Sequence, residues 1–193
     1  MSEQLLTSSQ TVGPFFHDCL LCTELLRNKL AAPETVGERI RIEGRVFDGD
    51  LQVVPDAVIE IWQANHHGRY NQHADQSEDH LDQGFFGFGR TGTDAAGNYW
   101  FETIKPGRVP FETGQLQAPH VCVAVFARGL LNHLYTRLYF ADEPANADDQ
   151  VLNCVPVERR STLLAQPQAS EQIVVYRFDI VLQGARETVF FNI

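Results

Sequence analysis

The stretch from His120 to Ala127 constrains the fold more than any other, because it carries no charge and alternates valine with other small or apolar residues. A run of this kind after a loop with Gly and Pro breakers is typical of a largely buried β-strand. His120 and Cys122 stand two apart, so both side chains lie on one face of that strand. They are placed like a pair of metal ligands. On spacing alone, however, we favour a hydrogen-bonded core histidine beside a small apolar cysteine.

Similar short patterns recur from residue 39 onward. Arg39 to Phe47 alternates polar and apolar residues and ends at Asp-Gly-Asp, which is a hairpin signal. Further strands are expected at 57–63, 89–93, 98–104, 135–140, 173–182 and 187–193, with a loop at 141–150 and a helical segment at 157–165. About eight short strands at regular spacing predict an all-β fold, an antiparallel β-sandwich with short helices.

The chain divides into an arm and one domain. A length of 193 residues with 44% hydrophobic residues suffices for a single core, which we assign to residues 39–193. Residues 1–38 are expected to form an N-terminal arm with a short helix near 18–30. Two aromatic residues, Phe15 and Phe16, follow a Gly-Pro kink there and need a surface to pack against. We therefore expect this arm to contact a partner.

Charge and hydropathy exclude several classes of partner. The formal net charge is −10, and only two of the fifteen basic residues are lysines, so nucleic acids and anionic membranes are not expected partners. The sequence contains neither an apolar run long enough to span a membrane nor a signal-peptide pattern, so we expect a cytoplasmic protein with free thiols.

Two histidine or cysteine clusters invite a metal-binding interpretation, and we reject both. Cys19 and Cys22 form a CxxC near His17, but no second CxxC or histidine pair completes a zinc site. The loop at 64–87 holds His66, His67, His73 and His80. Their spacing fits no compact ligand set, so a solvated polar loop is favoured. A better pair is Tyr70 with His120, because phenolate and imidazole suit ferric iron, although two further ligands are missing.

Several motifs in one order resemble those of the intradiol ring-cleavage dioxygenases. They are Glu60–Asn65 (EIWQAN), Gly68–Tyr70 (GRY), Phe88–Thr91 (FGRT), Thr103–Gly107 (TIKPG) and Ala118–Val121 (APHV). The likeness runs from residue 11 to residue 193. Within the family it is strongest to the α chains of members built from two chains, through Phe126–Gly129 (FARG) and Gly184–Phe191 (GARETVFF).

The resemblance implies that this chain does not hold the catalytic metal. In the family, the iron-bearing chain supplies two tyrosines and two histidines. Tyr70 matches the first tyrosine and His120 the first histidine, but Val109 and Cys122 take the places of the others. Valine has no donor atom, and a thiolate beside one imidazole suits zinc or copper better than ferric iron. The resemblance thus implies that these are relic positions, and that Fe(III) is bound by a β subunit.

The resemblance also implies a partner, a substrate and a pocket. The partner is the β subunit in an (αβ)n assembly, which uses O2 to cleave 3,4-dihydroxybenzoate between its hydroxylated carbons. Arg128, directly after the apolar strand, is expected to bind the substrate carboxylate, and Thr11, Gly13 and Pro14 to line the same pocket. Two alternatives remain open. One is a self-sufficient iron enzyme using Tyr70, His120, Cys122 and a loop histidine, and the other is a non-catalytic β-sandwich binding module.

Overall fold

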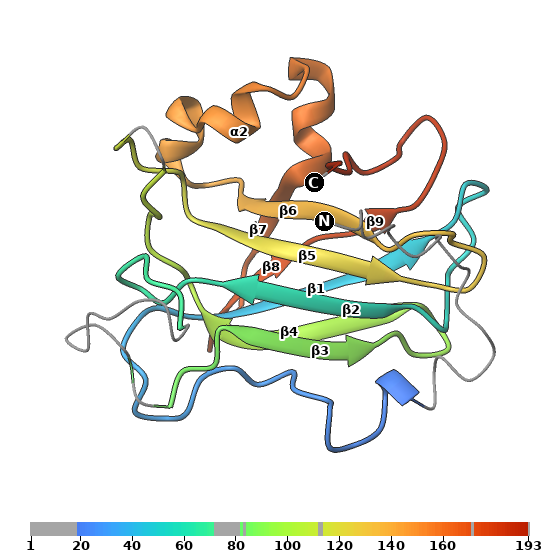
Figure 1. Ribbon diagram of the computed structural model, residues 1–193, viewed down its shortest axis with the longest axis horizontal. Helices are drawn as coiled ribbons and strands as arrows, with labels where there is room; N and C mark the ends of the chain where they lie inside the picture. The colour runs from blue at the N-terminus through green and yellow to red at the C-terminus, as the bar shows by residue number, and fades with distance from the viewer. Residues whose placement is uncertain (1–18, 72–81, 83, 112–113, 171, 193) are drawn as a thin grey trace, which may run out of the picture.

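The computed structural model describes residues 19–71, 82, 84–111, 114–170 and 172–192, and within them it is a β-sandwich (Figure 1). The strands of this described part are β1 (Arg39–Phe47), β2 (Val58–Gln63), β3 (Phe88–Gly92), β4 (Asn98–Ile104), β5 (His120–Phe126), β6 (Leu134–Phe140), β7 (Leu164–Gln168), β8 (Val174–Arg177) and β9 (Ile180–Val181). The strands expected from the alternating patterns before residue 141 are confirmed to within two residues.

The strands follow one hydrogen-bonded path, β3-β2-β5-β6-β7-β8-β1-β4, with β9 beside β1. One layer holds β3, β2, β5 and β6, the other holds β8, β1 and β4, and β7 connects them (Figure 1). The predicted all-β sandwich class is confirmed, but the sheet is mixed. The pairs β1–β8, β1–β9 and β6–β7 are parallel, because the chain returns to these strands by long connections rather than hairpins.

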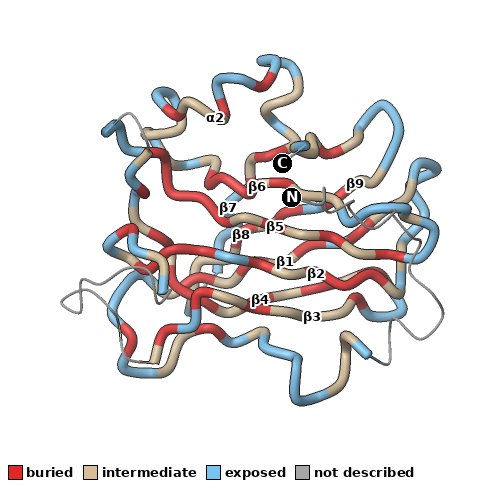
Figure 2. The backbone as a smooth tube through the Cα atoms, in the orientation of Figure 1, coloured by how far each residue is buried: buried red, intermediate tan, exposed pale blue. Residues whose placement is uncertain are grey.

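The core lies between the two layers. Along β1, Ile40, Ile42 and Val46 are buried while the intervening residues are partly exposed, and Figure 2 shows the same alternation along the neighbouring strands. In β5, Val121, Val123 and Val125 point into this core, so His120 and Cys122 point to the opposite face. Strand β5 therefore carries His120 and Cys122 on the outer face of its layer.

The C-terminal strand predictions are only partly correct. The strand predicted at 173–182 is split into β8 and β9 at Phe178, whose carbonyl turns toward Gly44 and accepts a hydrogen bond of 2.6 Å from the Tyr99 hydroxyl. A Cβ at Gly44 would lie 1.8 Å from that carbonyl oxygen, so glycine permits the close approach. No strand forms in residues 187–192, where Phe191 instead makes an isolated bridge to Tyr135.

A short helical segment covers the β6 edge above the start of β5 (Figure 1). It comprises η2 (Pro144–Asp148), α2 (Gln150–Asn153) and η3 (Val157–Leu163). Part of the loop predicted at 141–150 is thus a 3-10 turn, and the helix predicted at 157–165 is a 3-10 helix that gives way to β7. Leu152, Val155 and Leu163 form a second small core with Ala118 and Tyr139.

Residues 21–38 hold no α-helix, so the helix predicted at 18–30 is wrong over this part. Arg27 and Lys29 instead make isolated bridges to β3 and β4, and Leu30 is fully buried in the main core. The division at residue 38 and the arm's contact with a partner stay predictions. Within the described residues, the structure has no helix long and apolar enough to cross a membrane.

Candidate functional site

A polar cluster lies on the outer face of the β2-β5-β6 layer, where β5 begins. The strand register places Trp62 and Arg137 on either side of Cys122, and it places Tyr139 opposite His120. Side chains that are opposite in adjacent strands have Cβ atoms about 5 Å apart. These residues from three strands therefore form one contiguous group.

Tyr70 joins this group through a tight loop that leaves β2. The Asn65 side-chain oxygen accepts hydrogen bonds of 3.0 Å from the backbone nitrogens of His67 and Arg69. Gly68 has a positive φ of 76°, and a Cβ there would lie 1.9 Å from the Arg108 carbonyl oxygen. Only glycine fits this junction, which locks the two loops together and fixes the direction of Tyr70.

The Tyr70 ring stacks on Trp62, with centroids 6.3 Å apart and an interplanar angle of 22°. The Cys122 thiol lies beside its hydroxyl. Burial, and then the neighbouring Cys122, raise the pKa of Tyr70 well above its usual range. Burial also raises the pKa of the Cys122 thiol. Both groups are therefore protonated and uncharged near neutral pH.

Val109 and Gln117 close another side of the cluster. Val109 is 7% exposed, and its carbonyl accepts a 2.8 Å hydrogen bond from the Gln117 backbone nitrogen. The Gln117 side-chain oxygen in turn accepts a 2.8 Å hydrogen bond from Arg137 Nη1. The positions expected to be relic ligands, Tyr70, Val109, His120 and Cys122, thus converge on one place, and a guanidinium lies among them.

A buried carboxylate anchors the cluster to the helical segment. Asp149 is completely buried and caps α2 by accepting a 2.8 Å hydrogen bond from the Leu152 backbone nitrogen. It also accepts hydrogen bonds from the Ala118 backbone nitrogen (2.7 Å) and from the Tyr139 hydroxyl (3.0 Å). Arg137 lies 3.4 Å from that hydroxyl, so Tyr139 links the cation to the carboxylate.

His120 is the hydrogen-bonded core histidine that the spacing favoured. It is 1% exposed, and its Nδ1 lies 2.8 Å from the Ala118 carbonyl oxygen. A carbonyl only accepts, so Nδ1 carries the proton and Nε2 keeps its lone pair. Burial, helped by the charge of Arg137, lowers the pKa of His120 to about 4. The ring is therefore neutral at physiological pH.

This donor set does not fit a ferric iron centre. Val109 offers no donor, Cys122 stands where the family has a second imidazole, and the Arg137 guanidinium adds a positive charge. Burial alone would lower the pKa of Arg137, but Tyr139, Cys122 and Tyr70 raise it overall, so it stays charged. Nowhere in the described residues, this cluster included, is a group of three or more His, Cys, Asp or Glu side chains arranged to hold a metal ion.

Arg128 lies far from this cluster, beyond the other end of β5. Its side chain is 68% exposed and its Nε is paired with Asp56 Oδ2 in the turn before β2. β5 spans about 20 Å at the usual strand rise. The structure thus does not bring Arg128 to the relic positions. The expected pocket residues Thr11, Gly13 and Pro14 lie outside the described residues, so they stay predictions.

The described members of the other histidine and cysteine clusters form no metal site. Cys19 is exposed, and the nearby Cys22 thiol contacts its backbone oxygen at 3.8 Å. His66 contacts Asp82 at 3.1 Å, and its ring is tilted against that of His67 with centroids 3.7 Å apart. His17, His73 and His80 are outside the described residues.

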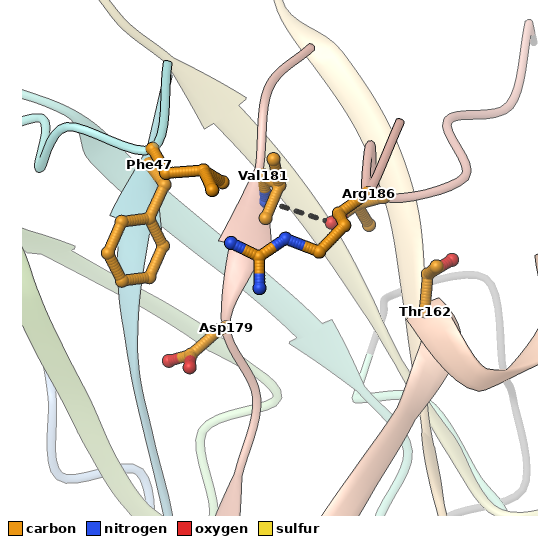
Figure 3. A pocket seen from close by; sticks show the side chains of 7 residues that line it. Phe47, Thr162, Asp179, Val181 and Arg186 are labelled. Atoms are coloured by element: carbon orange, nitrogen blue, oxygen red, sulfur yellow. Dashed lines mark hydrogen bonds between the residues drawn. The ribbon is translucent and has the colours of Figure 1, made fainter. Parts of the chain in front are cut away.

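A separate hollow of about 280 Å³ lies where β1 and β9 end, and Figure 3 shows Arg186 extending across it. It is lined by Phe47, Leu51, Thr162, Asp179, Val181, Arg186 and Thr188. The Thr188 hydroxyl accepts from the Val181 backbone nitrogen at 3.0 Å, and the Thr162 hydroxyl donates to the Arg159 carbonyl at 2.8 Å. These two hydroxyls stabilise the C-terminal segment.

Sequence reasoning missed Arg137, Gln117 and Asp149. Arg137 is the only charged residue in β6, which was a visible signal, but its importance depends on facing Cys122 in the neighbouring strand. Gln117 and Asp149 stood in segments read as loops, with nothing local to distinguish them. Strand register and the helical cap bring them to the cluster.

Comparison with known proteins gives the family. A family model described as "Dioxygenase" matches residues 12–184. The chain is 46% identical over 198 residues to the protocatechuate 3,4-dioxygenase alpha chain of Burkholderia cepacia, covering 97% of both chains. It is 34% identical over 186 residues to the beta chain of the same organism, covering 93% of this chain and 77% of that one.

Among solved structures, the dioxygenase domain of a dioxygenase carbohydrate-binding fusion from Streptomyces sp. SirexAA-E is 28% identical. It has a TM-score of 0.64 and covers 83% of this chain and 89% of that one. Together with the ordered motifs and the β-sandwich, these likenesses place the chain in the intradiol ring-cleaving dioxygenase family, to which it belongs.

Proposed function

We propose that this chain is the α subunit of a two-chain protocatechuate 3,4-dioxygenase and completes a substrate pocket around iron held by a β subunit. The assembly uses O2 to cleave 3,4-dihydroxybenzoate to 3-carboxy-cis,cis-muconate. The observation that carries the proposal is the polar cluster, which retains Tyr70 and His120 but has Val109 and Cys122 at the other two ligand positions, with Arg137 opposite Cys122. Likeness to an alpha chain over 97% of the length supports the same role.

Enzymes of this family are iron-dependent, and the ferric ion activates the catechol toward O2. This chain's own contribution is to bind and orient the substrate. Arg128 supplies a permanent charge for the substrate carboxylate, and Thr11, Gly13 and Pro14 form part of the pocket wall. Since Arg128 lies about 20 Å from the relic positions of its own chain, it can serve only a site completed by another chain.

The contact with Asp56 favours this use of Arg128. Asp56 contacts Nε of Arg128, and the arginine side chain is still 68% exposed, so the guanidinium is accessible to a ligand. A planar guanidinium can bind a carboxylate through two parallel hydrogen bonds. The ion pair therefore orients the group without using the atoms that would bind substrate.

Replacing Arg128 by Ala tests the proposal in the complex with the β subunit. We expect the KM for 3,4-dihydroxybenzoate to rise about 10- to 100-fold, since a charge-assisted hydrogen bond contributes about 1.5–3 kcal/mol. The KM for catechol, which lacks the carboxylate, should hardly change. Arg186→Ala, an exposed arginine at the hollow near β9, is the matched control and should leave both values unchanged.

Two outcomes would contradict the proposal. An Arg128→Ala complex with intact iron and unchanged KM for 3,4-dihydroxybenzoate would remove Arg128 from the pocket. Stoichiometric iron in this chain purified without its partner, with the visible colour of tyrosinate bound to ferric iron, would instead favour the self-sufficient enzyme.

A further inference from the structure

We propose that His133 is a positioning residue for Arg128. Its ring closes the base of the connection between β5 and β6 and so sets the direction in which Arg128 meets the substrate carboxylate. The inference rests on the proposed function, in which Arg128 binds that carboxylate. Its test compares variants of His133 with and without Arg128, so the inference and the proposed function can be told apart when one of them fails.

The ion pair of Arg128 and Asp56 continues the ladder between β5 and β2. Val58 lies opposite Phe126 in this antiparallel pair. The same register, continued by two residues, sets Asp56 opposite Arg128, and the contact between their side chains agrees with it. Residues two apart lie on the same face of a strand, so Arg128 projects from the outer face that carries Phe126. Its direction therefore depends on how the end of this face is held.

Arg128 occupies the second position of a tight turn. The Leu130 backbone nitrogen donates to the Ala127 carbonyl at 3.3 Å, and Gly129 has a positive φ of 86°, as the third residue of a type II turn requires. Ala127 is 1% exposed in the main core, and Leu130 packs against that core. The turn is thus anchored on the β5 side, whereas residues 131 and 132, which return the chain toward β6, are exposed.

The ring of His133 closes this return. His133 directly precedes β6, and its ring stacks on Phe126 with centroids 5.3 Å apart and an interplanar angle of 25°. The same ring makes an edge contact with Tyr135, at 4.5 Å and 88°. Three rings therefore join the two ends of the connection on the face from which Arg128 projects.

The ring contacts matter because the ion pair alone holds Arg128 weakly. An exposed ion pair contributes little, and Arg128 is contacted by Asp56 through Nε. A long side chain that is ordered only when it binds a ligand lowers the affinity by the cost of ordering it. By fixing the end of β5 against the start of β6, the His133 ring reduces that cost.

The test measures the steady-state kinetics of the iron-loaded two-chain complex. His133→Ala removes the ring, and we expect the KM for 3,4-dihydroxybenzoate to rise about 3- to 10-fold with kcat unchanged, because an aromatic pair is a modest interaction. His133→Phe is the matched variant. It keeps a flat ring against Phe126 and should stay within about twofold of wild type. The KM for catechol, which lacks the carboxylate, should change in neither variant.

A double variant shows whether His133 acts through Arg128. In the Arg128→Ala complex, adding His133→Ala should raise the KM no further, since the side chain that the ring positions is gone. If Arg128→Ala raises the KM and His133→Ala does not, this inference is overturned and the proposed function stands. If Arg128→Ala leaves the KM unchanged, the proposed function fails and this inference fails with it.

Three further outcomes would overturn the inference. An equal rise in the KM for catechol would make the ring a general part of the pocket wall. A rise in His133→Phe as large as in His133→Ala would mean that the imidazole itself acts on the substrate. A further rise in the double variant would show that His133 works independently of Arg128. The melting temperature is measured alongside, and a lower value with an unchanged KM would mean that the ring only stabilises the hairpin.

Discussion

The two ends of β5 differ in how they use charge. At its start, the charged Arg137 and Asp149 are enclosed with Tyr139, and their hydrogen bonds go to other protein groups. Beyond its end, Arg128 and Asp56 form an ion pair in which the arginine is 68% exposed. The polar groups at the start of β5 therefore stabilise the fold, while the ion pair beyond its end presents a charge to solvent or to a partner.

This difference indicates which end of β5 can bind a ligand. Buried polar groups that are satisfied by the protein contribute to stability, and removing one partner is costly. An exposed ion pair contributes little to stability, so it is free to be used for recognition. The end that carries the former ligand positions is thus structural, and the end that carries Arg128 is the candidate for substrate binding.

The largest expected effect is the loss of stability when the buried Asp149 is replaced. Asp149→Ala leaves the Ala118 nitrogen, the Leu152 nitrogen and the Tyr139 hydroxyl without their acceptor. We expect a loss of about 3 kcal/mol or more of unfolding free energy, combining a lost helix cap with two unsatisfied buried donors. For a chain of this size, that lowers the melting temperature by roughly 10 °C.

The matched variant is Asp149→Asn, which keeps the shape and one good acceptor. It should lose about half as much, measured by thermal unfolding of the two-chain complex. A melting temperature within about 2 °C of wild type for Asp149→Ala would mean that the carboxylate does not anchor the cluster.

The next effect is a pH dependence at the enclosed end. Burial lowers the pKa of His120 to about 4, below the usual histidine value of about 6.5, so the unfolded chain binds this proton first as the pH falls. Above about pH 6.5, His120 is neutral in both the folded and the unfolded state and does not change the free energy of unfolding. Between about pH 6.5 and pH 4, the free energy of unfolding falls progressively. The loss reaches on the order of 3 kcal/mol at that lower limit.

Replacing His120 by Asn should flatten this part of the stability curve, although it lowers stability at neutral pH. The measurement is the melting temperature of the complex between pH 7 and pH 4.5, before the acid limit. His133→Asn, an exposed histidine near the other end of the sheet, is the control and should keep the wild-type slope. An unchanged slope in His120→Asn would show that another group controls the acid response.

Much of the fold was accessible from the sequence, because alternation records which face of a strand is buried. Arg39–Phe47 and His120–Phe126 were found for this reason. The break near Phe178 was not accessible, since it depends on Gly44 in a distant strand. The order of strands and the parallel pairs were also missed, because alternation does not say which strand lies beside which.

The site was predictable in part. The motifs brought Tyr70, His120, Cys122 and Val109 into one hypothesis, which stays a prediction; in the structure Tyr70 lies beside Cys122, on the face of β5 that also carries His120. The cation among them was not predicted, because Arg137 reads as an ordinary polar residue of an alternating strand. Its role follows only from the register that sets it opposite Cys122. Contacts between side chains on neighbouring strands can be identified only once the strand pairing is known.

The smallest expected effect is on the KM for 3,4-dihydroxybenzoate when Asp56, the partner of the exposed Arg128, is replaced. Asp56 accepts from Nε of Arg128, so Asp56→Ala should let the guanidinium turn and raise the KM for 3,4-dihydroxybenzoate about 3- to 10-fold, at a stability cost below about 1 kcal/mol. Asp56→Asn keeps an acceptor for Nε and should stay within about twofold of wild type. An equal rise in both variants would show that the negative charge matters rather than the orientation. No rise in either would leave Arg128 oriented by something other than Asp56, and the ion pair would then be a feature of the turn alone.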